Sequence, residues 1–507
     1  MEQNTTKRIA KNTLMLYFRQ ILIMIVSLYT VRVVLNTLGA EDYGIYNVVA
    51  GVVSMFSFLS NSMATASQRY FSFALGQNDS ESLKKYFSMS FTIYCLIALV
   101  VLILAETVGL WFVTQKLVIP CERQKAAFWI YQASIFSMIC TILTAPFMAS
   151  IIAHEDMNIY AYVSIIEVVL KLGIVFLLPL FAVDKLIFYG FLMAGVVFIN
   201  TAIYRTICVK KYVECKFSFF WEKSLFKELV SFTGWNIFGS ISGVLKIQIV
   251  NIILNQFFNP IVNAARGIAA QVNSAVTSFS QNFSTAVRPQ IIKDFACGEK
   301  EKMIQLMFRS CKATFLLMFV FALPLILEMP YVLKLWLKNV PEYAVLFTIL
   351  TLIDALIDTI SYPLMTAAQA TGRIKLYQSV VGGVLLLNAP IAFIVLTFGA
   401  APYSVFIVSI CITFIAFIVR LFILKRLIDF SFWQFIGNVF IPVIICVVIS
   451  FVIPYFVRNM MNPSFIRLCV TVVVSVIWVA LSGYFVALSK NERQWIVEIV
   501  KSKLGKK

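Results

Sequence analysis

Residues Asn263 to Gln290 form an unusually polar segment, which reads NAARGIAAQVNSAVTSFSQNFSTAVRPQ. It carries Arg266 near its start and Arg288 near its end, and between them lie many serine, threonine, asparagine and glutamine residues but no charge. The chain around it is strongly apolar, because 61% of its 507 residues are hydrophobic and only 13% are charged. A soluble domain holds roughly 25% charged residues. A long polar segment in such an apolar chain therefore needs a specific explanation.

Apolar runs of about 18 residues or more recur along the whole chain, which predicts an all-α polytopic membrane protein with about fourteen transmembrane helices. No long hydrophilic stretch remains for a soluble domain. The predicted spans lie near residues 13–37, 43–69, 87–113, 126–151, 159–181, 186–208, 228–257, 261–287, 308–330, 342–371, 375–398, 401–424, 434–456 and 465–488.

Lysine and arginine in the connecting segments predict the orientation of these spans. With the N-terminus inside, the inner segments hold 29 of these residues and the outer segments hold 8. We therefore expect both termini in the cytoplasm. The net charge of +18 then reflects topology and anionic headgroups, so no nucleic-acid partner is expected.

An internal repeat appears when the sequence is shifted by about 219 residues, since Asn36 then falls on Asn255 and Arg69 on Arg288. The shift covers six spans, so both copies have the same orientation and form a parallel repeat. The predicted parts are an N-terminal six-helix lobe (1–220), a C-terminal six-helix lobe (221–430), two extra transmembrane helices (431–489) and a basic cytoplasmic tail (490–507).

The second and eighth spans each carry a polar face, because their polar residues recur at steps of three, four or seven. Those of the second span are Asn47, Ser54, Asn61, Thr65 and Gln68. Those of the eighth span are Ser274, Thr277, Gln281 and Ser284. Close helix packing through hydrogen bonds is one explanation. A water-filled cavity between the lobes fits better, because lipid penalises so long a polar stripe.

Basic residues inside the spans suggest an anionic ligand. Lys171 has Glu167 four residues before it, and we expect a structural ion pair there. The basic residues without an obvious local acid are Arg266, Lys246, Arg32 and Arg19. They would suit an anion, and guanidinium groups match phosphate oxygens in pairs. Arg19 and Arg32 could instead extend towards the membrane surface.

Asp354 and Asp358 are four residues apart in the tenth span and share a helical face. They could carry a coupling proton or Na⁺, or they could pair with the basic residues across the cavity.

Catalytic and metal-binding patterns are absent from the sequence. The single histidine, His154, excludes most catalytic triads and histidine metal sites, and no phosphate-binding glycine loop is present. We therefore predict no enzyme activity, no cofactor and no metal.

Three segments resemble bacterial polysaccharide repeat-unit flippases of the O-antigen and capsule type. They are 12–63, 265–299 and the segment YPLMTAAQATGRIKLYQ from Tyr362 to Gln378. These flippases belong to the multidrug/oligosaccharidyl-lipid/polysaccharide exporter superfamily.

The resemblance implies a two-lobed bundle with a central cationic cavity and alternating access. The implied substrate is an undecaprenyl-pyrophosphate-linked oligosaccharide, moved to the outer leaflet of the bacterial inner membrane for O-antigen, lipopolysaccharide or capsule synthesis. A polysaccharide polymerase or a glycosyltransferase would be a partner, besides membrane lipids. In the related lipid II flippases, cavity arginines of the early spans and the eighth span are implicated. Arg266 fits the eighth-span position, and Arg32 or Arg19 could stand in the first span, but the middle of the second span has no arginine.

Two other functions fit the composition less well. A cation-coupled small-molecule or drug exporter of the same superfamily would favour acidic cavity residues, and the excess of basic residues argues against it. An integral membrane polymerase or glycosyltransferase would need a large outer loop or a catalytic acid cluster, and the predicted outer loops are short.

Overall fold

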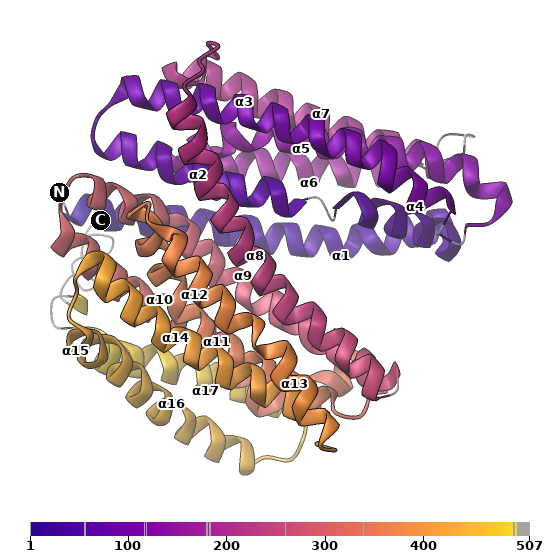
Figure 1. The fold of residues 1–507 in the computed structure, drawn as a ribbon. Helices are drawn as coiled ribbons and strands as arrows, with labels where there is room; N and C mark the ends of the chain where they lie inside the picture. Colours follow the sequence, from indigo (N-terminus) through magenta and orange to yellow (C-terminus); the bar gives the residue numbers. More distant parts are fainter. Residues whose placement is uncertain are drawn as a thin grey trace, which may run out of the picture. The chain divides into compact units, whose positions relative to one another are not determined.

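The computed structural model describes residues 2–489 and 492–493, apart from 55–56, 116, 118, 179–180, 182–183, 259 and 338. The described residues are almost entirely helical and contain no β-strand, which confirms the predicted all-α class (Figure 1). Most of the predicted tail 490–507 lies outside the described residues, and so do the side chains of Arg32, Asn47, Ser54 and Asn61.

Two compact units divide the chain. The first comprises Met1–Ser240 with Thr285–Gly298, and the second comprises Ile241–Ser284 with Glu299–Lys507. Two helices, α8 (Lys223–Phe257) and α9 (Pro260–Ala296), contribute residues to both units. The lobe boundaries predicted from the repeat stay a prediction.

The first unit is a bundle of long helices. Its remaining elements are α1 (Glu2–Ser54), α2 (Ser57–Gly76), α3 (Ser80–Leu104), η1 (Ala105–Gly109), α4 (Leu110–Gln115), η2 (Cys121–Arg123), α5 (Gln124–Ala153), α6 (Met157–Leu177), α7 (Lys185–Lys211) and η4 (Val213–Cys215). Helix α5 is the most buried of its membrane-length helices and contacts α2, α3 and α7. Aromatic side chains such as Phe87 and Phe147 pack in this core with their ring centres 5.6 Å apart.

A glycine separates the first two predicted spans within α1. Gly39 has φ 83° and ψ 166°, a conformation that is not helical. Residues with a Cβ atom rarely adopt a positive φ. The chain can therefore turn at this position, and the first predicted span ends just before it.

The second unit is also helical. Its remaining elements are α10 (Lys300–Leu337), α11 (Ala344–Ala370), α12 (Ile374–Leu386), α13 (Asn388–Thr397), α14 (Ser404–Ile428), α15 (Phe432–Phe435), η5 (Ile436–Phe440), α16 (Ile441–Asn459), α17 (Phe465–Ser482) and η6 (Gly483–Ala487). Helix α11 lies against α10 and α14, and α17 lies against α10 and α16.

Eleven helices of the described chain are long and apolar enough to cross a membrane. The predicted spans near 43–69, 228–257 and 261–287 are not among these eleven, although helices occupy their described residues. The chain is a multi-pass membrane protein, and the count of about fourteen spans stays a prediction.

Candidate functional site

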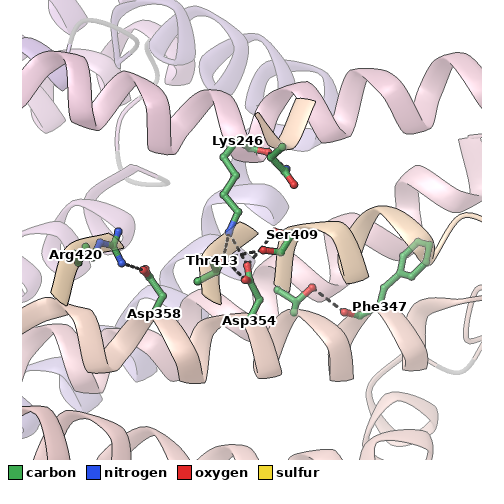
Figure 2. Close-up of polar contacts among 9 residues, drawn as sticks. Lys246, Phe347, Asp354, Asp358, Ser409, Thr413 and Arg420 are labelled. Carbon is green, nitrogen blue, oxygen red and sulfur yellow. Dashed lines mark hydrogen bonds and ion pairs between the residues drawn. The ribbon is translucent and has the colours of Figure 1, made fainter. Parts of the chain in front are cut away.

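A network of charged and hydroxyl side chains lies inside the second unit, where α8, α11 and α14 come together (Figure 2). Lys246 of α8 donates hydrogen bonds to Asp354 Oδ2 of α11 at 2.9 Å and to Thr413 Oγ1 of α14 at 2.5 Å. Ser409 Oγ donates to Asp354 Oδ2 at 3.1 Å, and Thr413 donates to Asp354 Oδ1. The carboxylate of Asp354 is therefore held by one ammonium and two hydroxyl groups.

A second ion pair lies beside the first, between α11 and α14. Arg420 of α14 donates to Asp358 Oδ1 of α11 at 3.1 Å. Asp354 and Asp358 thus each meet a basic residue of their own unit. Ion coupling and pairing across a cavity, the two alternatives considered from the sequence, both stay predictions. Arg420 is buried within α14.

Lys246 and Asp354 are mostly shielded, with side-chain exposures of 13% and 21%. Removing one partner of a buried ion pair costs about 3–5 kcal/mol, because the other charge is left without compensation. An anionic ligand could bind Lys246 only by displacing Asp354, or after Asp354 had gained a proton. Ligand binding at Lys246 is therefore linked to the ion pair with Asp354.

The polar face of α9 is partly open and partly buried in the second unit. Ser274 and Gln281 are exposed, Arg266 is half-buried, and Thr277 and Ser284 are buried. The Thr277 hydroxyl also donates to the backbone oxygen of Asn273 at 2.8 Å. Some hydroxyl groups of this face thus form their hydrogen bonds within the helix itself. The exposed residues of the face can meet water or a ligand.

Three predicted site residues lie in the first unit. Gln68 is buried, and its Oε1 accepts a hydrogen bond from Arg288 Nη1 at 3.2 Å. Thr65 is half-buried on the same helix. Arg19 is buried against α6, with its guanidinium 4.4 Å from the centre of the Tyr160 ring. The Arg19 side chain therefore packs inside the first unit.

The predicted site residues with described side chains thus fall into two groups. The first unit holds Arg19, Thr65 and Gln68, and the second holds Lys246, Arg266, Ser274, Thr277, Gln281, Ser284, Asp354 and Asp358. A shared cavity lined by both groups stays a prediction. The structural pair of Lys171 with Glu167 is confirmed, with the two charged atoms 2.6 Å apart.

Sequence reasoning missed the partners of Asp354 and Asp358 on α14. Ser409, Thr413 and Arg420 are separated by four and seven residues, which places them on one helical face. The four-residue spacing of Ser409 and Thr413 equals that of Asp354 and Asp358. The matching spacing of polar residues in the tenth and twelfth predicted spans was the sequence signal that could have indicated this contact.

The family follows from a comparison of the sequence. The family model described as polysaccharide biosynthesis protein matches residues 9–295, more than half of the chain. The chain belongs to this family. The membership confirms the resemblance found in the sequence. No curated protein matches the chain.

Solved structures of MATE transporters share the fold. One, an outward-facing multidrug resistance MATE family transporter of the MOP superfamily, has a TM-score of 0.73 and 12% identity, covering 84% of this chain and 96% of its own. A MATE transporter in the bent conformation has the same TM-score and coverage at 11% identity. The MATE transporter ClbM in complex with Rb⁺ has a TM-score of 0.68 and 15% identity, covering 85% of this chain and 96% of its own. The chain therefore combines membership of a polysaccharide biosynthesis family with the fold of these transporters.

Proposed function

We propose that the chain is a flippase for an undecaprenyl-pyrophosphate-linked oligosaccharide repeat unit. It would move this lipid from the cytoplasmic to the outer leaflet of the bacterial inner membrane by alternating access. The observation that carries the proposal is the match to a polysaccharide biosynthesis family on a transporter fold. The flipped unit would serve a polysaccharide polymerase or a glycosyltransferase in O-antigen, lipopolysaccharide or capsule synthesis.

The residues fit the chemistry of such a substrate. Arg266 would bind the pyrophosphate, since a guanidinium group forms paired hydrogen bonds with phosphate oxygens. Lys246, Arg32 and Arg19 are the further candidates for this anion. Exposed polar groups of α9, such as Ser274 and Gln281, would meet sugar hydroxyls. The polyprenyl tail would stay in lipid, because burying it in a polar cavity would forfeit its apolar surroundings.

The test measures lipid-linked glycans by mass spectrometry in cells that lack the protein. We expect the undecaprenyl-pyrophosphate oligosaccharide to accumulate and the wild-type protein to clear it. Arg266→Ala, expressed at the wild-type level, should fail to clear it, whereas Arg205→Ala, which removes an exposed arginine of α7, should clear it. Clearance by Arg266→Ala would reject the role of Arg266. No accumulation, in cells that make the precursor and lack a redundant flippase, would reject the flippase.

A second candidate is a cation-coupled exporter of small molecules or drugs. The MATE structures of the same fold favour it, and one of them is a complex with Rb⁺. The carboxylates of Asp354 and Asp358 would then be the coupling groups. Increased drug sensitivity of cells lacking the protein, with unchanged lipid-linked glycans, would favour this candidate over the flippase.

A further inference from the structure

The last part of α9 belongs to the first unit, although most of the helix belongs to the second. This part is Thr285–Gly298, which the predicted orientation places at the cytoplasmic side. Ala286 is fully buried there, in a cluster with Leu16 of α1 and Met157 of α6. One continuous helix therefore contributes to both units, and its inner end is held by contacts of the first unit.

Glu155, in the turn between α5 and α6, is the centre of these contacts. Its side chain is 0% exposed and lies 2.7 Å from Arg8 Nε of α1 and 2.7 Å from Lys293 Nζ of α9. Asn12 donates a hydrogen bond to its backbone oxygen at 2.9 Å, and Arg8 donates to Gln290 of α9 at 3.1 Å. A single buried carboxylate thus joins the first helix of the chain to the inner end of α9.

The backbone of Glu155 adopts a conformation that favours glycine. Its φ is 63°, and it closes the end of α5 with hydrogen bonds from Glu155 N to Ile152 O and from Asp156 N to Ile151 O. Helices commonly end in this way, usually with glycine at this position. A glutamate there is strained relative to glycine. The glutamate side chain makes the two ion pairs, which glycine could not form.

The turn that carries Glu155 is itself fixed. The His154 ring stacks on Tyr212 with their centres 4.2 Å apart, and His154 Nε2 lies 2.5 Å from Glu214. Lys211 donates to Asp156 Oδ2 at 2.7 Å. These contacts come from the end of α7 and from η4, so the carboxylate of Glu155 is presented from a rigid support.

Gly76, the last residue of α2, provides a second and independent contact with the same part of α9. A Cβ atom at this position would lie 2.9 Å from Ala296 Cβ and 2.9 Å from the backbone oxygen of Lys293. The thiol of Cys297 donates to the backbone oxygen of Gly76 at 2.9 Å. The two helices can approach this closely only because Gly76 has no side chain.

We infer that Glu155, Lys293 and Gly76 form a latch that docks the inner end of α9 in the first unit, and that this latch opens in each transport cycle. When it is closed, the buried charges satisfy each other; when it is open, water can hydrate both. Alternation between two packed states is the usual basis of such a switch. The inference rests on the proposed function only in its link to the transport cycle.

The first test follows the docking of α9 directly. Ala286→Cys is introduced into a protein whose native cysteines are replaced by serine, and a polar maleimide is applied from the cytoplasmic side. In the parent protein the buried thiol should react slowly. Glu155→Gln and Lys293→Met should each speed the reaction about tenfold or more, because each removes the ion pair that ties Glu155 to α9. Lys293→Arg should keep the slow rate. The control is Lys302→Met, which breaks the exposed pair with Glu299 and should change nothing.

The second test changes no charge. Gly76→Ala should also speed the labelling of Ala286→Cys, because the new methyl group pushes α9 away. Gly267→Ala, at a position of α9 with no atom within 4 Å of the new Cβ, should leave the rate unchanged. Each variant is also purified and shown to be monodisperse in detergent, so that loss of fold is not mistaken for undocking.

The outcomes separate the latch from the proposed function. Unchanged labelling in Glu155→Gln, Lys293→Met and Gly76→Ala would overturn the latch. Faster labelling with normal clearance of lipid-linked glycans would overturn its role in transport. Failure of the flippase proposal would appear elsewhere, as absence of glycan accumulation in cells that lack the whole protein.

Discussion

The pairing of Lys246 with Asp354 shows how two opposite charges are accommodated inside an apolar bundle. Each ion alone would be costly in the membrane interior. Together, and with the hydroxyl groups of Ser409 and Thr413, they satisfy one another. The contribution of each residue to the free energy of unfolding therefore depends on the presence of the other.

We expect Lys246→Met and Asp354→Asn each to lower the free energy of unfolding by about 3 kcal/mol, because each leaves one member of the pair uncompensated. The double substitution should cost less than the sum of the two. Thermal unfolding in detergent measures all three variants. The pair of Lys171 with Glu167, with exposures of 33% and 26%, is a matched control and should show a smaller coupling. Strictly additive effects for Lys246 and Asp354 would contradict the pairing.

Asp354 is also the candidate residue for coupling transport to a proton or Na⁺ gradient. Asp354→Asn keeps a similar shape but can neither gain nor lose a proton, so we expect export to depend differently on the ion gradient. The measurement is glycan export in vesicles under an imposed proton or Na⁺ gradient. An identical gradient dependence in wild type and Asp354→Asn would remove this residue from the coupling mechanism.

Among whole elements, α17 is held against α10 by one ion pair near its start and by another just after η6, which follows it. Glu328 of α10 lies 2.7 Å from Arg467 of α17, and their side chains are 0% and 10% exposed. Lys312 of α10 lies 2.8 Å from Glu492, which follows α17. The two α10 residues are about 24 Å apart along the helix, so the ion pairs hold most of the length of α17.

The pair at the Glu492 end should be sensitive to acid. Burial raises the pKa of Glu492, but the hydrogen bond and charge of Lys312 together with Ser489 lower it below its usual value of 4.5. A lowered pKa in the folded state means that the pair stabilises the fold above pH 4.5 and loses its effect as the pH falls through the lowered pKa. We expect the difference in melting temperature between wild type and Lys312→Met to shrink between about pH 7 and about pH 3. A difference that does not change with pH would contradict this account.

At the scale of the whole molecule, the predicted topology can be tested with two native cysteines. Cys121, in η2, and Cys297, after α9, are both exposed. The charge distribution places Cys121 outside and Cys297 in the cytoplasm. In proteins that keep only one of these cysteines, a membrane-impermeant maleimide added to intact spheroplasts should label Cys121 alone. Labelling of Cys297 should require inverted vesicles, and the reverse pattern would overturn the orientation.

The sequence by itself determined the helical membrane class, the family and most of the helices, because these depend on local properties. Hydropathy over about 20 residues and the recurrence of polar residues at helical spacing can be read directly from the chain. The i,i+4 pair of Glu167 with Lys171 was predictable for the same reason, since both residues lie on one turn of one helix.

Which buried charges pair with each other depends on the tertiary structure and could not be predicted from the sequence. Lys246 and Asp354 are 108 residues apart, and Glu155 and Lys293 are 138 residues apart. Helical periodicity shows which residues share a face, but it does not show which helix that face meets. The partners of Lys246 and Glu155 are fixed by how the helices pack within each unit, because an ion pair needs contact between side chains that the chain order does not bring together.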